Sequence, residues 1–312
     1  SNKIAPQSHY VTDWLGKRAR LTPDRIALID KSNHSRTTFH QWNRRVNRTA
    51  NFLKSLGVGK GDRVAVYASN RAEYLDLFWA APKIGAMLQN LNWRLTVFEL
   101  MGIVESGAPT IFIYSEDWRP QVEELKPSFT TIEHVVAMTT PGTGERDFAE
   151  RDLMSPMLSN LPELALDDPW GIYYTGGTTG LPKVAVLTHG NVTWNSVNTI
   201  TSWGINSQHK AALQLPFFHI GGPNIFMAPL VHAGGTTVLC SGFDVDETFD
   251  LVELAGITHY VAVPSMFQML QEHPRWEDTD FSNLELVISG GAPCPLPGMQ
   301  KCWERGVDCR GG

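Results

Sequence analysis

From about residue 60 onward, short runs of β-branched and aromatic residues alternate with longer amphipathic stretches. This alternation is typical of layered α/β proteins, in which helices cover the faces of buried sheets. The apolar runs predict strands over Arg63–Ala68, Thr110–Tyr114, Glu133–Met138, Gly171–Thr175, Val184–Thr188, Ala211–Leu215, Thr236–Cys240, Thr258–Val263 and Leu284–Ser289. The stretches between them predict helices over 71–86, 189–202, Asp246–Ala255, Pro264–Glu272 and Pro295–Arg305.

Several residues mark where the predicted helices begin or break. Asn191 is placed to cap the helix over 189–202, and Pro264 and Pro295 stand in first turns, where a missing N–H is tolerated. Pro82 falls inside the helix over 71–86, so we expect a kink or an early end there.

The length and one irregular segment suggest how the chain is divided. At about 150 residues per domain, 312 residues allow two domains or one large α/β unit. Thr139–Pro169 is rich in Pro, Gly, Ser and acidic residues and lacks clear periodicity. It is therefore predicted to be a surface connection and the boundary between two layered subdomains.

Composition excludes several classes of protein. With 26 Lys+Arg against 32 Asp+Glu, the net charge of −6 has the wrong sign for coating phosphate backbones, so no nucleic-acid partner is expected. A content of 42% hydrophobic residues excludes a disordered chain. No apolar run approaches the roughly 18 residues that span a bilayer. The N-terminus lacks the pattern of an export signal, so we expect a cytoplasmic location.

Cysteine and histidine spacing indicates no metal or redox motif. The four cysteines, Cys240, Cys294, Cys302 and Cys309, contain no C-x₂-C pair, and we expect them to be reduced thiols. The ten histidines include no H-E-x-x-H pair, so no metal site made of side-chain nitrogens is predicted.

A glycine- and threonine-rich segment between two predicted strands can hold an anion. Glycines let the backbone approach closely, threonine hydroxyls add donors, and Lys183 supplies a charge worth roughly 1–4 kcal/mol at about 4 Å from a phosphate oxygen. The common P-loop pattern is excluded, because Pro182 precedes Lys183 and Val184 follows it. On composition alone, a flexible Gly/Thr hairpin explains the segment equally well.

Tyr174 to Lys183, with the apolar strand and Thr188-His189 that follow, resembles the phosphate loop of the adenylate-forming acyl-coenzyme A synthetases, Y-T-S-G-T-T-G-x-P-K-G. The resemblance implies that Lys183 is catalytic and that Thr178 helps to hold Mg²⁺. The residues that it implies for binding the ATP phosphates are Thr175, Gly176, Gly177, Thr178, Thr179, Gly180 and Lys183. Gly176 stands where the family often has Ser, which implies a weaker phosphate grip or a looser loop, and Val184 stands where it usually has Gly.

A second segment, Leu215-Pro216-Phe217-Phe218-His219, resembles the motif at the acyl pocket of this family. The resemblance implies that His219 is catalytic and lies near the substrate carboxylate or the adenylate. It implies an acyl site formed by Phe218, His219, Gly221 and Gly222. By itself, a histidine after two phenylalanines is more often a core residue, and close helix packing explains the two glycines equally well.

A third segment, Ile288 to Pro293, resembles the adenine-binding turn of the family, where small residues let the flat base lie against the backbone. The implied adenine-binding residues are Gly290, Gly291, Ala292 and Pro293. Without the other motifs, an ordinary strand-to-helix turn explains this segment as well. Gly61 to Val66 and Asn92 to Thr96 match the family's scaffold pattern.

The resemblance implies an α/β fold, namely the layered αβαβα large N-terminal domain of the adenylate-forming enzymes, with two sheets flanked by helices. It places about 61–188 in one subdomain and about 1–60 plus 189–312 in the other. The chain stops just short of the family's Y-G-x-T-E segment. We therefore expect an N-terminal portion, truncated before the barrel and the C-terminal domain, which is inactive and binds nucleotide weakly by itself.

The function implied is that of an ATP-dependent acid–coenzyme A ligase. It uses ATP, Mg²⁺ and coenzyme A, activates a fatty or other hydrophobic carboxylic acid as acyl-AMP, and then transfers the acyl group to coenzyme A. Two alternatives stay open: an adenylating enzyme for aryl acids or for a carrier-protein thiol, and a non-catalytic module that binds a nucleotide or an acyl ligand. The sequence does not fix the oligomeric state, and the resemblance leaves a homodimer open.

Overall fold

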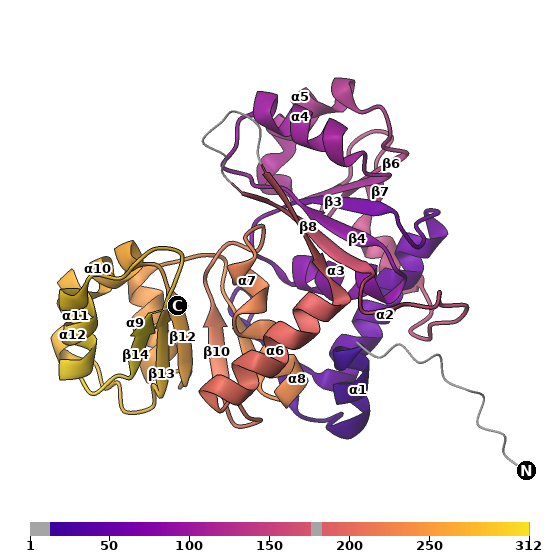
Figure 1. Cartoon of the computed structure of the whole chain (residues 1–312). Helices are drawn as coiled ribbons and strands as arrows, with labels where there is room; N and C mark the ends of the chain where they lie inside the picture. The colour runs from indigo at the N-terminus through magenta and orange to yellow at the C-terminus, as the bar shows by residue number, and fades with distance from the viewer. Residues whose placement is uncertain (1–12, 176–182, 312) are drawn as a thin grey trace, which may run out of the picture. The chain divides into compact units, whose positions relative to one another are not determined.

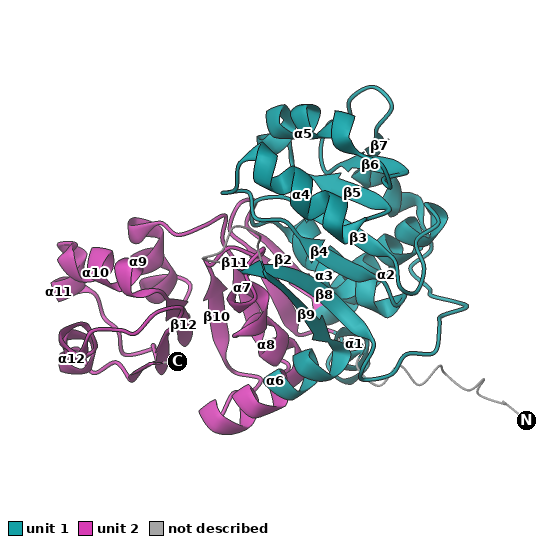
Figure 2. Ribbon diagram, turned by 45° about the horizontal axis from the view of Figure 1, so that its top comes forward, with its two compact units in different colours: residues 1–23, 39–195 teal, residues 24–38, 196–312 magenta. Residues whose placement is uncertain are grey.

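The computed structural model describes residues 13–175 and 183–311, which form two compact units, teal and magenta in Figure 2. Of these residues, unit 1 takes those up to 23 and those from 39 to 195, and unit 2 takes 24–38 and those from 196 onward. Each unit is built on a seven-stranded sheet. The expected α/β class with two helix-flanked sheets is confirmed.

Unit 1 has the strand order β7-β6-β5-β3-β4-β8-β9, and the β8–β9 pair is antiparallel while the other pairs are parallel. Its strands are β3 (Arg63–Tyr67), β4 (Met87–Asn90), β5 (Ile111–Tyr114), β6 (His134–Ala137), β7 (Arg146–Asp147), β8 (Pro169–Thr175) and β9 (Lys183–Thr188). Its helices are α1 (Trp14–Leu21), α2 (Phe39–Ser55), α3 (Ala72–Lys83), α4 (Val97–Gly107) and α5 (Arg119–Leu125), with 3₁₀ turns at Glu116–Trp118, Lys126–Ser128 and Phe148–Leu153.

Hydrophobic packing covers both faces of this sheet. Phe112 of β5 packs in one core with Leu100 of α4 and Val122 of α5. Elsewhere in the unit, the rings of Phe78 and Trp79 from α3 lie 5.4 and 5.6 Å from that of Trp170 on β8. Because the parallel strands are buried between helices, they consist of nearly continuous apolar runs, which is why the sequence pattern identified them.

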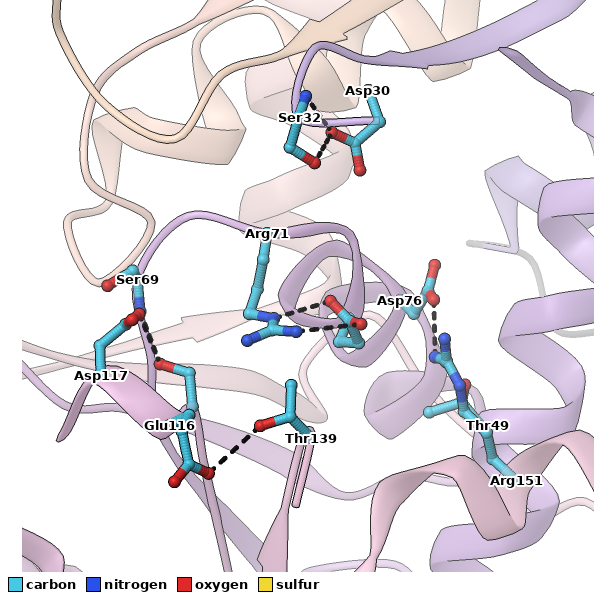
Figure 3. Close-up of polar contacts among 12 residues, drawn as sticks. Asp30, Ser32, Thr49, Ser69, Arg71, Asp76, Glu116, Asp117, Thr139 and Arg151 are labelled. Carbon is cyan, nitrogen blue, oxygen red and sulfur yellow. Dashed lines mark hydrogen bonds and ion pairs between the residues drawn. The ribbon is translucent and has the colours of Figure 1, made fainter. Parts of the chain in front are cut away.

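The segment Thr139–Pro169 lies inside unit 1, so its predicted role as the boundary between subdomains was wrong. It carries Arg151, whose Nη1 lies 2.7 Å from Oδ2 of the buried Asp76 on α3, as Figure 3 shows. Asp76 also accepts hydrogen bonds from Trp42 Nε1 and Arg45 Nε, both at 2.8 Å. This buried polar cluster ties the irregular segment to α2 and α3.

Backbone carbonyls of the same segment also accept hydrogen bonds from α2. The Asn47 amide donates to the Pro156 carbonyl at 3.0 Å, and the Asn51 amide donates to the Ser155 carbonyl at 2.7 Å. A coil that satisfies its backbone in this way needs no periodic pattern. Composition therefore could not show that it belongs to unit 1.

Unit 2 has the strand order β14-β13-β12-β10-β11-β1-β2, in which only the β1–β2 pair is antiparallel. Its strands are β1 (Ile26–Asp30), β2 (Ser35–Thr38), β10 (Lys210–Leu213), β11 (Thr236–Leu239), β12 (His259–Ala262), β13 (Leu286–Ser289) and β14 (Cys309–Gly311). Its helices are α7 (Gly221–Asn224), α8 (Met227–Ala233), α9 (Val245–Glu253), α10 (Pro264–Glu272), α11 (Arg275–Asp278) and α12 (Leu296–Glu304), and α6 (His189–Trp203) crosses from unit 1 into unit 2.

Two cores cover the two faces of the unit 2 sheet. On one face, Phe249 of α9 and Phe267 of α10 pack in a core with Val287 of β13. On the other, Leu230 of α8 packs with Ile288 of the same strand. Figure 1 accordingly shows α9 to α12 gathered beside β12–β14, away from α7 and α8.

The expected division of the chain needs one correction. Residues 39–60, which we expected in the second subdomain, belong to unit 1, and of the described residues up to position 60 only 24–38 join unit 2. The reason is that α2 buries its apolar face within unit 1, where Trp42 reaches Asp76. In contrast, β1 pairs with β11 of unit 2.

All nine predicted strands are present, with bounds that differ by at most two residues at either end, and all five predicted helices are present. The helix over 71–86 ends early, at Lys83, directly after Pro82. Pro264 does begin α10. Thr188, not Asn191, caps α6: Asn191 N–H donates to Thr188 Oγ1 at 3.1 Å, while Asn191 Oδ1 accepts from Thr188 N–H at 2.9 Å.

Two expectations about membranes and thiols can be compared with the structure. No helix in the part of the chain that the structure describes is both long and apolar enough to cross a membrane. Cys240, Cys294, Cys302 and Cys309 are all free thiols.

Candidate active site

The predicted phosphate segment joins the ends of the β8–β9 hairpin in unit 1. Thr175 and Lys183 are directly paired across the two strands, and both are exposed. The segment therefore stands between two strands, as predicted. Gly176, Gly177, Thr178, Thr179 and Gly180 lie outside the described residues, so their assignment to the ATP phosphates stays a prediction.

The base of this hairpin is anchored by buried polar groups. Gln89 of β4 is fully buried, and its amide donates to the Tyr174 hydroxyl at 2.7 Å and to the Ile103 carbonyl at 3.1 Å. Gly107 of α4 leaves room for this amide, since a Cβ there would lie 2.2 Å from Gln89 Nε2. Thr175 and Lys183 therefore stand at the ends of strands that buried hydrogen bonds hold in place.

The other two predicted segments both follow the carboxyl ends of parallel strands in the unit 2 sheet. In the sheet, β11 lies on one side of β10 and β12 lies on the other. The order in which the chain adds strands to the sheet therefore reverses its direction between β10 and β12. In open parallel sheets, ligands bind outside the carboxyl ends of the strands at such a reversal. The His219 segment follows β10, and the Gly290 turn follows β13, which pairs with β12. Thr175 and Lys183 belong to unit 1 and are not part of this edge.

His219 stands at this edge with an exposed ring, while Phe217 and Phe218 before it are buried. The Gly221 N–H donates to His219 Nδ1 at 3.1 Å, so a neutral ring carries its proton on Nε2. The core-residue alternative therefore applies to the two phenylalanines and not to the histidine. The histidine ring lies at the surface of unit 2.

The two glycines after His219 have different surroundings. A Cβ on Gly222 would lie 2.4 Å from the Pro216 carbonyl oxygen, so this glycine is required by the close approach of two backbone segments. A Cβ on Gly221 would lie 3.2 Å from the end of the Ile225 side chain. Close helix packing explains Gly222, and the acyl-site assignment of Phe218, Gly221 and Gly222 stays a prediction.

The predicted adenine turn offers an open backbone surface. A Cβ on Gly290 would meet nothing within 4 Å, and Gly291 has φ +80°, a conformation that favours glycine. Gly291, Ala292 and Pro293 are exposed. A flat ring can therefore lie against this turn, as the adenine assignment requires.

Two polar residues at the same edge were missed by sequence reasoning. Gln214 Nε2 and Ser289 Oγ are buried and have no hydrogen-bond partner within the described ranges. Ser289 pairs with Ala262 across β13 and β12, and Gln214 directly follows β10, which pairs with β12 on its other side. The sequence signal was a polar residue at the carboxyl end of each apolar strand.

Gln214 is held in place by its other atom. Gln214 Oε1 accepts hydrogen bonds from the Tyr260 hydroxyl at 2.6 Å and from the Thr248 hydroxyl at 3.0 Å. The amide nitrogen is left as a fixed donor in a buried environment, where an unmade hydrogen bond is costly. Such a group is a candidate for binding a polar ligand atom or a water molecule.

The structure gives no test of the predicted Mg²⁺ site. Across residues 13–175 and 183–311, no group of three or more His, Cys, Asp or Glu side chains is arranged to hold a metal ion. Thr178 lies outside these ranges. Its role toward Mg²⁺ stays a prediction.

Comparison with protein families gives a match over nearly the whole chain. The family described as "AMP-binding enzyme" matches residues 15–310. A feruloyl-CoA synthase from Amycolatopsis sp is 33% identical over 94% of this chain and 57% of its own length. An indoleacetate–CoA ligase from Aromatoleum aromaticum is 30% identical over 95% of this chain and 58% of its own length. The chain thus spans a little over half the length of these curated relatives.

Solved structures agree with this match. The inhibitor-bound N-terminal domain of FACL13 from Mycobacterium tuberculosis has a TM-score of 0.85 and 26% identity, and the match covers 97% of this chain and 75% of that one. The anthranilate CoA ligase AuaEII in complex with anthranoyl-AMP has a TM-score of 0.87 over 99% of this chain and 60% of its own. At 22% identity, the second likeness concerns the fold alone.

Proposed function

Because the chain belongs to the AMP-binding enzyme family, we propose that its protein is an ATP-dependent ligase that joins a carboxylic acid to coenzyme A. The observation that carries the proposal is the edge of unit 2 where the winding reverses. It presents the exposed His219 ring and the open Gly290–Pro293 turn together, one suited to a carboxylate and the other to a flat base.

The proposed reaction has two steps. The substrate carboxylate attacks the α-phosphorus of ATP, which forms acyl-AMP and releases pyrophosphate, and the thiol of coenzyme A then displaces AMP. Negative charge accumulates on the phosphate oxygens in the first step, and a positioned cation stabilises it. We assign this role to Lys183, at the end of the anchored hairpin, together with the segment that precedes it.

His219 is proposed to contact the carboxylate or the adenylate. With Nδ1 engaged by the Gly221 N–H, a neutral ring carries its proton on Nε2, and we assign the contact with a ligand oxygen to this N–H. The buried Phe217 and Phe218 fix the segment that carries it. Mg²⁺ would neutralise phosphate charge when bound, and Thr178 is the residue proposed to help hold it.

The proposed substrate is a hydrophobic carboxylic acid. A fatty acid is the first candidate, as the resemblance of the sequence motifs implies, and a long-chain-fatty-acid–CoA ligase of M. tuberculosis is 29% identical over 90% of the chain. An aromatic acid is the second candidate, because the relatives at 33% and 30% identity are named for feruloyl and indoleacetate substrates. Released pyrophosphate, measured over a panel of both kinds of acid with the whole protein, distinguishes the two.

Nucleotide binding can be tested on the 312 residues themselves. We expect a hydrolysis-resistant acyl-AMP mimic to raise the melting temperature more than ATP with Mg²⁺, and Lys183→Ala to reduce the ATP response. Lys54→Ala is the matched control, since this lysine of α2 donates to the Ser159 carbonyl and is not among the predicted ligand-binding residues. An ATP response unchanged by Lys183→Ala would remove this residue from its role. No response to any ligand would favour a non-catalytic module.

A further inference from the structure

Two of the four cysteines are brought together in unit 2. Cys302 lies in the last turns of α12 and Cys309 begins β14, and both side chains are buried. The two thiols form a hydrogen bond with each other. The turn between them is closed by the Val307 N–H, which donates to the Cys302 carbonyl, and by the Trp303 indole, which donates to the Cys309 carbonyl, both at 3.0 Å.

The environment of this pair makes the two sulfur atoms unequal. Cys302 Sγ accepts a hydrogen bond from the Gln271 side-chain amide at 3.4 Å in addition to that from the Cys309 thiol. Hydrogen bonds to a sulfur favour its thiolate form. The thiol of Cys309 lowers the pKa of Cys302 despite burial, while the pKa of Cys309 is raised by the same contact and by burial.

The surroundings also leave room for the sulfur atoms to move. Cys302 and Val307 both line an apolar cavity of about 20 Å³ between the sheet and α9, α10 and α12. A disulfide requires the two sulfurs to approach to about 2.05 Å with a defined dihedral angle, so the side chains must rotate. In the described part of the sheet, β14 pairs with β13.

We propose that Cys302 and Cys309 are a modification site at which a peroxide converts two thiols into one disulfide. The Cys302 thiolate attacks one peroxide oxygen, the O–O bond breaks, and hydroxide leaves, giving a sulfenic acid at Cys302. The Cys309 sulfur then attacks the Cys302 sulfur, the S–O bond breaks, and the oxygen leaves as water with the Cys309 proton. The peroxide is reduced to two water molecules and the dithiol is oxidised.

This inference is independent of the proposed ligase activity. The disulfide would join the last turn of α12 to β14, on the far end of α12 from the Gly290–Pro293 turn. It also differs from the sequence-based expectation of four unconnected thiols, because the pairing depends on how α12 and β14 fold back on each other. The two cysteines do not have the C-x₂-C spacing by which a sequence indicates a redox pair.

Peptide mapping tests the proposal directly. Lys301, Arg305 and Arg310 flank the pair, so trypsin places Cys302 in peptide 302–305 and Cys309 in peptide 306–310. After hydrogen peroxide treatment of the 312-residue chain, alkylation of remaining thiols and non-reducing digestion, we expect these two peptides linked, lighter by two hydrogen atoms. Cys240, which is buried without a second thiol, should stay alkylatable for about ten times longer.

Variants separate the roles of the two sulfurs. Cys309→Ser should leave Cys302 as a sulfenic acid that reacts with dimedone, whereas Cys302→Ser should leave Cys309 unreactive. Cys294→Ser is the matched control and should leave the linked peptides unchanged. Linkage of either cysteine to Cys294, or thiol loss at Cys302 no faster than at Cys240, would overturn the proposal. The wild-type mapping decides the matter even if a serine variant fails to fold.

Discussion

At the scale of single residues, Gly221 and Gly222 differ in how well the fold can accommodate a side chain. The chain turns back at Pro216–Phe217 and then begins α7, so Gly222 lies against a backbone carbonyl that has no freedom to move. Gly221 instead faces the end of a flexible side chain. Their adjacent positions provide a matched pair for mutation.

We expect Gly222→Ala to destabilise unit 2 by about 1–3 kcal/mol, because its Cβ would overlap the Pro216 carbonyl at 2.4 Å. Gly221→Ala should cost less than about 1 kcal/mol, since the Ile225 side chain can shift away. Urea denaturation of both variants against the wild type measures the difference. Equal losses for the two would contradict the packing argument for Gly222.

A buried histidine should make unit 1 sensitive to acid. Burial lowers the pKa of His189 from 6.5 to about 4, although the charge of Asp168 acts in the opposite direction. In the unfolded chain, the His189 ring binds a proton below about pH 6.5, whereas in the folded chain it does so only below about pH 4. The free energy of unfolding therefore falls as the pH is lowered through this interval. At pH 5 the loss is about 2 kcal/mol relative to pH 7.

His189→Gln should remove this part of the pH dependence, seen as a smaller change in urea midpoint between pH 7 and pH 5. His40→Gln, at an exposed position of α2, is the control and should leave the wild-type change in place. A His189→Gln protein with the full pH dependence would show that other groups cause it.

The candidate site could be predicted from sequence only where a residue has a local signature. His219 and the Gly290 turn were found because each stands in a run that resembles a family motif. Gln214 and Ser289 were not found, because their missing hydrogen bonds depend on which strand lies opposite. That register is a property of the folded sheet.

At the scale of elements, the buried carboxylate of Asp76 organises α2, α3 and the 3₁₀ turn that carries Arg151. Burial would raise the pKa of Asp76, but the guanidiniums of Arg45 and Arg151 outweigh burial and hold it below its ordinary value. The charge is therefore kept, and it is compensated by two cations and the Trp42 indole. Removing it would leave two guanidiniums with a neutral partner.

We expect Asp76→Asn to lower the stability of unit 1 by about 3–5 kcal/mol, the usual effect of breaking a buried ion pair. Glu123→Gln is a suitable control, because Glu123 is solvent-exposed and the loss of its ion pair with Lys126 should cost no more than about 1 kcal/mol. Urea denaturation compares the two isosteric changes. A stability loss for Asp76→Asn as small as that of the control would contradict the assigned role.

One strand that the sequence did not predict, β4, shows the physical reason for such a miss. Met87–Asn90 is half polar, yet it forms the buried strand β4, because Gln89 bonds Tyr174 and Asn90 accepts from the Tyr74 hydroxyl at 2.7 Å. The apolar strands could be predicted since their burial requires continuous apolar runs. A strand whose buried polar side chains bond to residues elsewhere in the chain carries no such pattern. The elements of the first 60 residues were likewise not predicted.

At the scale of the whole molecule, the chain path makes unit 2 discontinuous. β1 pairs in parallel with β11, so Leu28 lies opposite Thr237, more than 200 positions along the chain. Thr236 Oγ1 adds a hydrogen bond to the Ile26 carbonyl at 2.8 Å, and the Lys31 N–H donates to the Leu239 carbonyl at 3.0 Å. The sheet of unit 2 is therefore completed by β1, a strand from the early part of the chain that pairs with a strand more than 200 residues further on.

It follows that residues 189–312 should not fold cooperatively when produced alone. Without β1, the backbone edge of β11 and its apolar side chains would be left unpaired, a state that favours aggregation. Fusing residues 24–38 to this fragment through a flexible linker should restore a single cooperative thermal transition, because it returns the missing pair of strands. A fusion carrying the same 15 residues in scrambled order is the control. If the fragment melted cooperatively without the added segment, β1 would be a dispensable addition to unit 2, and the long-range pairing would contribute little to its stability.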